Sequence, residues 1–217
     1  MTRAGSGPSG SSFGTRSRCR VDSPFQLASG VAQGHATVAL AHLLFSLTAD
    51  PEHLVAIVGP TGAGKTTLLY QIKTQDTQKT IPTIGFNLET LEMGDTNFLV
   101  WDLGGQDKIR LIWRHYFQNT QAIVYVVDSA NLEDIEPAKE ELDRLLTDPE
   151  LKDALLLVLA NKQDLGGLSA DEVSRRLGLA KIKDRVWTCL PLSAANGKGI
   201  SNAFKWLTTN LASKIGK

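Results

Sequence analysis

Short apolar runs alternate with amphipathic stretches from residue 53 to the end of the chain. Buried strands are predicted at 53–59, 122–128, 154–160 and 185–194, and helices at 65–73, 135–146, 169–179 and 199–215. Residues 86–92 and 97–105 flank a turn at 93–96 and predict an antiparallel hairpin. Ser169 stands at the cap of the third helix, with Glu172 in the capping-box position. This alternation predicts an α/β fold with a mostly parallel six-stranded sheet and helices on both faces.

The first 37 residues form a tail rich in Gly, Ser and Arg, with no acidic residue before Asp22. Such a segment has too little apolar surface to order itself. It also matches a transit peptide, which is rich in Arg and Ser and poor in acidic residues. A disordered tail, or a segment foreign to the natural protein, is the favoured interpretation.

Residues 38–50 predict a short amphipathic helix ahead of the main domain at 51–217. Leu40, Leu43, Leu44 and Leu47 follow the spacing of one helical face, and Asp50-Pro51 ends the helix. The run is too short for a membrane span, so no transmembrane segment is predicted. Residues 38–48 therefore either lie on a membrane surface or pack against the domain, and periodicity alone does not separate these alternatives.

Composition excludes several function classes. The 217-residue chain has 23 basic and 23 acidic residues, so no overall field attracts nucleic acid or an acidic membrane. Cys19 and Cys189 are the only cysteines and no Cys/His metal spacing occurs. This usage favours a reduced, cytoplasmic protein without a structural metal.

The stretch "GPTGAGKTT" at 59–67 matches the phosphate-loop pattern GxxxxGK[ST] between a predicted strand and a predicted helix. Glycines let backbone amides approach phosphate oxygens, and the helix N-terminus adds its positive dipole end. Lys65 is expected to reach the β and γ phosphates, and Thr66 to offer its hydroxyl to Mg²⁺. The candidate phosphate-binding residues are Gly59, Gly62, Ala63, Gly64, Lys65, Thr66 and Thr67. The loop alone does not choose the base, since an ATPase could carry it as well.

The stretch "NKQD" at 161–164 follows a buried strand and selects guanine. Guanine presents two neighbouring donors, N1–H and the 2-amino group, and the two oxygens of Asp164 match them. Asn161 is expected to bond N7 and tie this loop to the phosphate loop, while the stem of Lys162 lies on the purine face. Adenine would leave Asp164 unpaired, which argues against an ATPase.

The stretch "SAAN" at 193–196 ends the last predicted strand. Its Ala194 N–H is expected to donate to guanine O6, and its candidate nucleotide-binding residues are Ser193, Ala194 and Ala195.

The sequence resembles the Arf and Arf-like small GTPases of the Ras superfamily from about residue 52 to the end. "TIPTIGFN" at 80–87 is similar to the family's first switch, "WDLGGQDKIR" at 101–110 to its second, and 113–129 to the run that follows. The resemblance implies a P-loop NTPase G domain that binds GTP and GDP with Mg²⁺. It also implies a molecular switch, an enzyme that hydrolyses GTP slowly and recruits effectors while GTP is bound.

Several roles follow from the resemblance alone. Thr83 binds Mg²⁺ and the γ-phosphate, Asp102 holds the metal through water, Gly105 N–H contacts the γ-phosphate, and Gln106 orients the attacking water. The implied catalytic residues are Gln106, Lys65 and Thr83, and the implied metal-binding residues are Thr66, Thr83 and Asp102. An exchange factor and a GTPase-activating protein are the implied regulators.

The resemblance also implies an effector surface and a membrane role. Phe86, Trp101 and Tyr116 match the family's exposed aromatic triad, or are ordinary core aromatics. The helix at 38–48 occupies the place of the family's membrane-binding helix. The expected location is the cytoplasm, with peripheral contact to the Golgi or other endomembranes and a role in vesicle-mediated transport.

Two positions depart from the family pattern. Residue 2 is threonine rather than glycine, so no N-myristoyl group is expected. Thr61 stands where Arf proteins usually carry aspartate, and its β-branched side chain is expected to crowd the attacking water. An alternative function is therefore a guanine-nucleotide-dependent binding module with little or no turnover.

Overall fold

The structure is a computed structural model that describes residues 52–74, 86–93, 96–103 and 117–215. Its strands are β1 Glu52–Val58, β2 Phe86–Met93, β3 Thr96–Leu103, β4 Ala122–Asp128, β5 Leu155–Asn161 and β6 Trp187–Pro191. They form one sheet in the order β2-β3-β1-β4-β5-β6. β2 pairs antiparallel with β3 and the other neighbours are parallel. The predicted six-stranded, mostly parallel sheet and its hairpin are confirmed.

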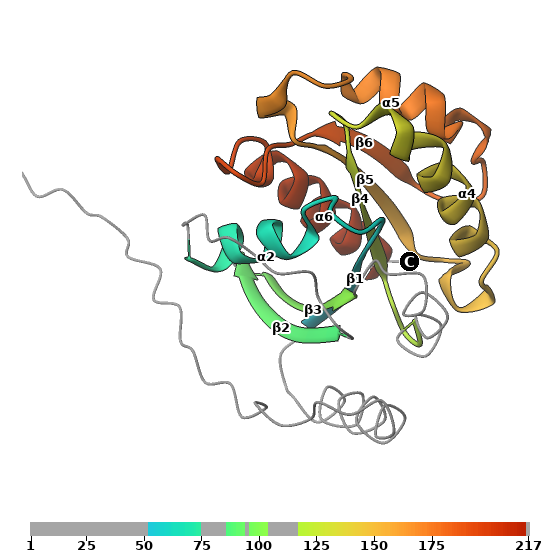
Figure 1. The fold of residues 1–217 in the computed structure, drawn as a ribbon. Coiled ribbons are helices and arrows are strands. Elements are labelled where there is room, and N and C mark those ends of the chain that lie inside the picture. The colour runs from blue at the N-terminus through green and yellow to red at the C-terminus, as the bar shows by residue number, and fades with distance from the viewer. Residues whose placement is uncertain (1–51, 75–85, 94–95, 104–116, 216–217) are drawn as a thin grey trace, which may run out of the picture.

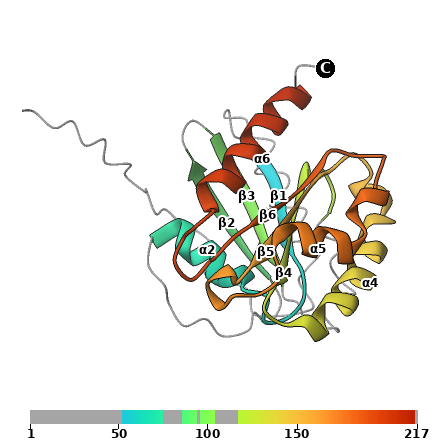
Figure 2. The same ribbon diagram turned by 90° about the horizontal axis from the view of Figure 1, so that it is seen from above.

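Helices cover both faces of the sheet, as predicted. Their bounds are α2 Lys65–Thr74, α4 Ile135–Leu146, α5 Ala170–Leu177 and α6 Ile200–Ile215. Short 3-10 turns are η3 Leu132–Asp134, η4 Pro149–Leu151, η5 Gln163–Leu165 and η6 Leu179–Lys181. α2 and α6 lie on one face, and α4 and α5 on the other (Figures 1 and 2).

The two faces of β5 enter two different cores. All seven of its residues are buried. The side chains that pack towards α2 and α6 are Leu155, Leu157 and Leu159, and those that pack towards α4 and α5 are Leu156, Val158 and Ala160. A strand covered on both faces needs apolar residues at every position, because side chains alternate between the faces. This explains why the stretch is a continuous apolar run.

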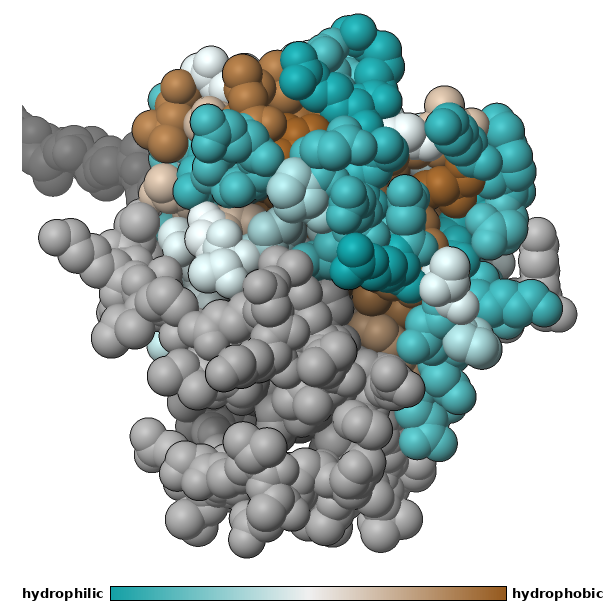
Figure 3. All heavy atoms as spheres, turned by 45° about the vertical axis from the view of Figure 1, so that its right-hand side comes forward, coloured by the Kyte–Doolittle hydropathy of each residue, from teal (hydrophilic) through white to brown (hydrophobic). Residues whose placement is uncertain are grey.

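The outer helices are amphipathic, and α5 begins as predicted. Ser169 Oγ accepts the backbone N–H of Glu172 at 3.2 Å, which caps the helix. The Glu172 carboxylate pairs with Arg176 at 3.0 Å and with Arg175. Hydrophilic residues cover much of the described surface on the α4 and α5 side, and hydrophobic residues show in separate areas between them (Figure 3).

The sheet register brings several candidate residues to one edge. Ile57 of β1 pairs with Asp102 of β3, and Asp128 of β4 pairs with Asn161 of β5. In open α/β sheets, ligands bind at the carboxyl ends of the strands. The site is therefore built from the loops that follow β1, β3, β4, β5 and β6.

Some predicted segments lie outside the described residues. These are the tail at 1–37, the helix at 38–50, and the residues Thr83, Gly105, Gln106 and Tyr116. Phe86 and Trp101 lie in β2 and β3, and the structure describes their backbones only. Within the described ranges, no helix combines the length and apolar character that crossing a bilayer requires.

Candidate nucleotide site

The loop between β1 and α2 needs glycine at its first and last positions. Gly59 has φ of 137°, and a Cβ there would lie 2.3 Å from the carbonyl oxygen of Val126 on β4. Gly64 has φ of 94°, and a Cβ there would lie 2.4 Å from Nδ2 of Asn161. Any larger residue would thus be strained in its backbone and would clash with a neighbouring strand or loop. The glycines let this loop lie directly against the ends of β4 and β5.

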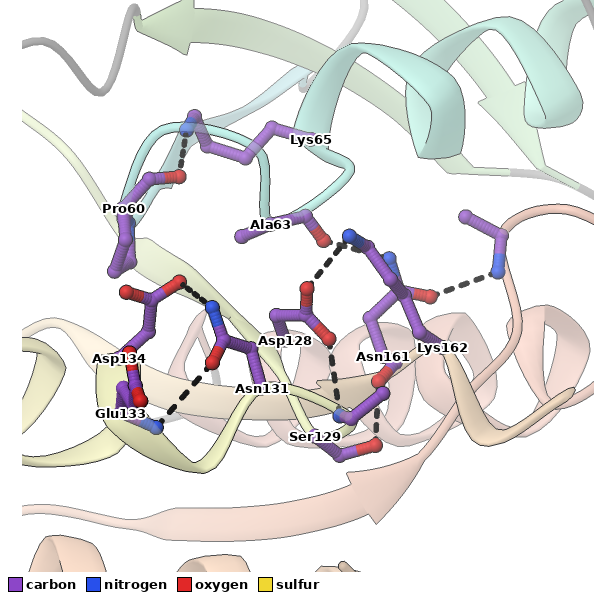
Figure 4. A network of polar contacts seen from close by, with 12 residues as sticks. Pro60, Ala63, Lys65, Asp128, Ser129, Asn131, Glu133, Asp134, Asn161 and Lys162 are labelled. Atoms are coloured by element: carbon purple, nitrogen blue, oxygen red, sulfur yellow. Dashed lines mark hydrogen bonds and ion pairs between the residues drawn. The ribbon is translucent and has the colours of Figure 1, made fainter. Parts of the chain in front are cut away.

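Lys65 is the first residue of α2 and places a cation inside this loop. The side chain is buried, and its ammonium Nζ donates to the carbonyl oxygens of Gly59 at 2.7 Å and Pro60 at 2.8 Å (Figure 4). A buried cation is tolerated when such acceptors surround it. The same region holds the N-terminal N–H groups of α2, at the positive end of the helix dipole. Positive charge and backbone donors together suit an anion.

Thr66 and Asp102 join α2 to the end of β3. Thr66 Oγ1 donates to Asp102 Oδ2 at 2.9 Å, and Asp102 is completely buried. A hydroxyl and a carboxylate are hard oxygen donors of the kind that Mg²⁺ prefers. The donor set therefore fits the predicted metal site.

Asn161 holds three loops together, and its predicted tie to the phosphate loop is confirmed. Its side chain is buried, and Nδ2 donates to the carbonyl oxygen of Ala63 at 2.7 Å. Its Oδ1 accepts the backbone N–H of Ala194 at 2.8 Å. One amide side chain thus links the loops after β1, β5 and β6. Its predicted contact with N7 stays a prediction.

The predicted donation from the Ala194 N–H to guanine O6 stays a prediction. In the structure this N–H donates to Asn161 Oδ1 at 2.8 Å. The reason is that β5 and β6 are neighbours, so the loop after β6 lies within reach of the Asn161 side chain.

Asp164 is held by the loop after β6. Ser193 is buried, and its Oγ donates to Asp164 Oδ1 at 2.6 Å, while Asp164 itself is exposed. A hydroxyl donor on Oδ1 restrains the orientation of the carboxylate before any ligand binds. Ser193 was predicted to bind nucleotide, and in this structure it orients the residue predicted to recognise the base.

Lys162 has a partner that the sequence analysis did not identify. Its Nζ lies 2.6 Å from Oδ2 of Asp128, the last residue of β4 (Figure 4). The sequence offered one signal for this contact, because Asp128 is a charged residue at the end of a buried strand. The sequence analysis also did not identify Ser129, Gln163 and Gly167 as residues of the site. Their roles depend on contacts between loops, which the sequence does not show.

The fold and the site define a class of protein. A strand, a glycine loop and a helix with the GxxxxGK[ST] pattern stand beside an Asn-Lys-x-Asp loop at the carboxyl edge of a mostly parallel sheet. This is the P-loop NTPase fold of the small GTPases. The model of the ADP-ribosylation factor (Arf) family matches residues 40–211, and the chain belongs to this family.

A solved structure agrees with this assignment. The chain is similar to the Arl6 BBS3 small GTPase from Trypanosoma brucei, solved with a bound nucleotide analogue, GppNp. The two share 29% sequence identity, with a TM-score of 0.70, and the match covers 75% of this chain and 99% of that one. As a member of the Arf family, the chain is a GTP-binding protein and a GTP hydrolase.

Proposed function

We propose that the chain is a GTP/GDP switch that selects guanine through Asp164. The observation that carries the proposal is the 2.6 Å hydrogen bond from Ser193 to Asp164 Oδ1. It orients the carboxylate beside a loop that Asn161 ties to the phosphate loop. Two carboxylate oxygens then meet N1–H and the 2-amino group of guanine, which adenine cannot offer in this arrangement.

The phosphates bind at the start of α2. Backbone N–H groups from Gly62 to Thr67 surround the phosphate oxygens, and Lys65 contacts the β and γ phosphates. In the structure the Lys65 ammonium already lies on the loop carbonyls of Gly59 and Pro60. Binding therefore needs only a short movement of a side chain that is already ordered.

Thr66 and Asp102 hold Mg²⁺ together with Thr83. The ion neutralises charge on the β and γ phosphates when it is bound. The support is the adjacency of the Thr66 hydroxyl and the Asp102 carboxylate, 2.9 Å apart. Thr66 would offer its hydroxyl to the ion, and Asp102 would hold it through water.

Gln106 orients the water that attacks the γ-phosphate, while Gly105 and Thr83 tie both switches to it. These three roles rest on family membership, since the residues lie outside the described part of the chain. Unassisted hydrolysis is slow, on the order of 10⁻⁴ to 10⁻³ per second, and an activating protein accelerates it. An exchange factor replaces GDP with GTP.

The base assignment is tested by the Asp164→Asn variant. Asparagine offers one acceptor and one donor, so it matches xanthine rather than guanine. We expect GDP affinity to fall by at least about 10²-fold, because the bond from the 2-amino group is lost, an amide donor faces that group, and the bond from N1–H loses its charged acceptor. Affinity for xanthosine diphosphate should rise. Asp171→Asn, which removes an exposed carboxylate on α5, is the control and should leave both affinities unchanged. Unchanged GDP affinity in Asp164→Asn would refute the assignment.

The GTP-bound form acts in vesicle-mediated transport at the cytoplasmic face of an endomembrane such as the Golgi. Residues 38–48 contact the lipid surface and Phe86, Trp101 and Tyr116 contact effectors. Family membership supports this proposal. The test is sedimentation of the GTP-loaded chain with liposomes, with and without residues 38–48. Absence of binding in both forms would exclude the membrane role.

Thr61 favours a second function, a nucleotide-dependent binding module with little turnover. Thr61 is exposed in the phosphate loop, at the position where aspartate is usual in the family. Chromatography of the nucleotide released from the denatured, purified protein separates the two functions. Bound GDP supports completed hydrolysis, whereas bound GTP supports the binding module. A Thr61→Asp variant that hydrolyses GTP no faster than the parent would show that Thr61 is not the cause of slow turnover.

A further inference from the structure

Lys162 has an unusual backbone for its residue type. Its φ and ψ are 66° and 33°, in the left-handed region. Among the described residues, Asn119 and Lys162 are the non-glycine residues with positive φ. A residue with a Cβ is disfavoured in this conformation, whereas glycine adopts it freely. A lysine kept at such a position indicates that its side chain has a task there.

Asp128 fixes the end of that side chain. Lys162 Nζ lies 2.6 Å from Asp128 Oδ2, and the two side chains are 32% and 13% exposed. The other oxygen, Oδ1, accepts the backbone N–H of Ala130 at 3.0 Å. Because one oxygen accepts a backbone N–H, rotation of the carboxylate away from the ammonium would break that hydrogen bond. The lysine is therefore anchored at its backbone and at its charged end.

The neighbouring residue holds the two loops together beneath this ion pair. Ser129 is buried, and its N–H and Oγ both donate to the carbonyl oxygen of Asn161, at 3.0 and 2.6 Å. Gln163 Nε2 donates to Ser129 Oγ at 2.8 Å and to the carbonyl oxygen of Leu168 at 2.7 Å. A Cβ on Gly167 would lie 2.2 Å from the carbonyl oxygen of Ser129. These contacts hold the loop that follows β5 in place against residues 128–129.

We propose that Asp128 is a positioning residue for guanine nucleotide binding. It acts through Lys162 by holding the ammonium, so that the stem of Lys162 lies ready across the purine face and slows nucleotide release. The inference rests on the proposed function, because that function gives Lys162 its contact with the base. A free lysine has many rotamers to lose on binding, and a preformed ion pair removes that cost.

The measurement is release of fluorescently labelled GDP into excess GDP at saturating Mg²⁺. Asp128→Asn keeps an oxygen for the Ala130 N–H and removes the charge that holds Lys162. We expect release about two- to tenfold faster, which corresponds to the ordering cost of one long side chain. Glu136→Gln is the matched control. It removes a 2.8 Å ion pair with Lys139 on α4, and release should not change.

A double-mutant cycle separates positioning from a general structural role. Lys162→Ala removes the stem and the ammonium, so release should accelerate at least as much as in Asp128→Asn. If Asp128 acts through Lys162, the double variant should release GDP no faster than Lys162→Ala alone. The single-turnover rate of GTP hydrolysis should stay at the parent value in Asp128→Asn, since the γ-phosphate binds at the other end of the site.

Three outcomes would overturn the inference. The first is unchanged release in Asp128→Asn. The second is a double variant whose acceleration is the product of the two single effects, and the third is equal loss of GDP retention and of single-turnover hydrolysis. A parent chain that retains no GDP at all would refute the proposed function itself, whereas each of the three outcomes with a GDP-retaining parent refutes only the role of Asp128.

Discussion

Thr66 on α2 and Asp102 at the end of β3 are joined by a 2.9 Å hydrogen bond from hydroxyl to carboxylate. The two residues are 36 positions apart, and the parallel pairing of β1 with β3 brings them together. Because Asp102 is completely buried, the sheet itself fixes the position of its carboxylate. The distance between the helix and the strand is therefore set before a metal ion binds.

We expect Asp102→Asn to shift the dependence of GDP retention on Mg²⁺ to higher Mg²⁺ concentrations. The variant keeps an oxygen for the Thr66 hydroxyl but loses the charge that attracts the ion. Metal affinity should fall by about 10- to 100-fold, as is usual when such a supporting group is changed. The variant should therefore need about 10- to 100-fold more Mg²⁺ than the parent to retain GDP equally well. The exposed Asp143→Asn on α4 should behave as the parent does. A variant that retains GDP at the same Mg²⁺ concentrations as the parent would contradict the assignment.

A second prediction compares two glycines of the phosphate loop. Gly64→Ala and Gly62→Ala both place a Cβ at positive φ, 94° and 79°. Only at Gly64 does the Cβ meet an atom, Asn161 Nδ2 at 2.4 Å, whereas nothing lies within 4 Å at Gly62. Gly62→Ala should lower the free energy of unfolding by about 1–2 kcal/mol. Gly64→Ala should lower it by a further ~1–3 kcal/mol through the clash.

GDP affinity should distinguish these two variants more clearly than the free energy of unfolding does. In Gly64→Ala the clash displaces Asn161 from Ala63, so GDP affinity should fall in this variant and stay close to the parent value in Gly62→Ala. Urea unfolding and titration with labelled GDP measure the two effects. Equal GDP affinities in both variants would show that the tie between Asn161 and Ala63 does not support binding.

The strands and the two signature loops could be predicted from the sequence because each is encoded locally. The continuous apolar run of β5 is enough by itself to predict a strand that is buried on both faces. The spacing of the glycines likewise identifies the phosphate loop without knowledge of the rest of the fold. The spatial order β2-β3-β1-β4-β5-β6 was not predicted, since it depends on which distant strands pair.

The contacts of the loop that follows β5 could not be predicted from the local sequence. The hydrogen bond from the Ala194 N–H to Asn161 Oδ1 was not predicted from the sequence. The ion pair of Lys162 with Asp128 joins residues 34 positions apart and depends on a left-handed backbone at a lysine. Propensity disfavours that conformation, so only the packing of neighbouring loops reveals it.

Ser193→Ala should weaken the discrimination between guanine and hypoxanthine. Without the 2.6 Å bond from Ser193 Oγ, the exposed Asp164 carboxylate is free to rotate. A hydrogen bond to a charged group contributes about 1.5–3 kcal/mol, and part of this orients Asp164 for the 2-amino group. We expect the ratio of GDP to inosine diphosphate affinity to fall about five- to tenfold. Competition binding measures it, with Ser213→Ala near the end of α6 as the control. An unchanged ratio would mean that Asp164 needs no support from Ser193.

The last prediction concerns Cys189 on β6. Burial, with a smaller contribution from the negative charge of Asp171, raises the pKa of the Cys189 thiol from 9.0 to about 12. Its Sγ donates to the carbonyl oxygen of Ala170 at 3.3 Å. The thiolate is the reactive form, so the folded protein should react very slowly with a disulfide reagent at pH 8. In a Cys19→Ser background the single remaining thiol should react fully only after unfolding in guanidinium. Fast reaction in the folded state would contradict the burial.

The same pKa shift makes stability depend on pH in a defined direction. The unfolded chain loses the Cys189 proton near pH 9, whereas the folded chain keeps it up to about pH 12. Between these values the unfolded state binds fewer protons, so the free energy of unfolding should fall as pH rises. Below pH 9 both states keep the proton and the contribution is flat. Replacing Cys189 with alanine in the Cys19→Ser background should remove this part of the alkaline slope. An identical slope in the two proteins above pH 9 would show that the thiol is not the group responsible.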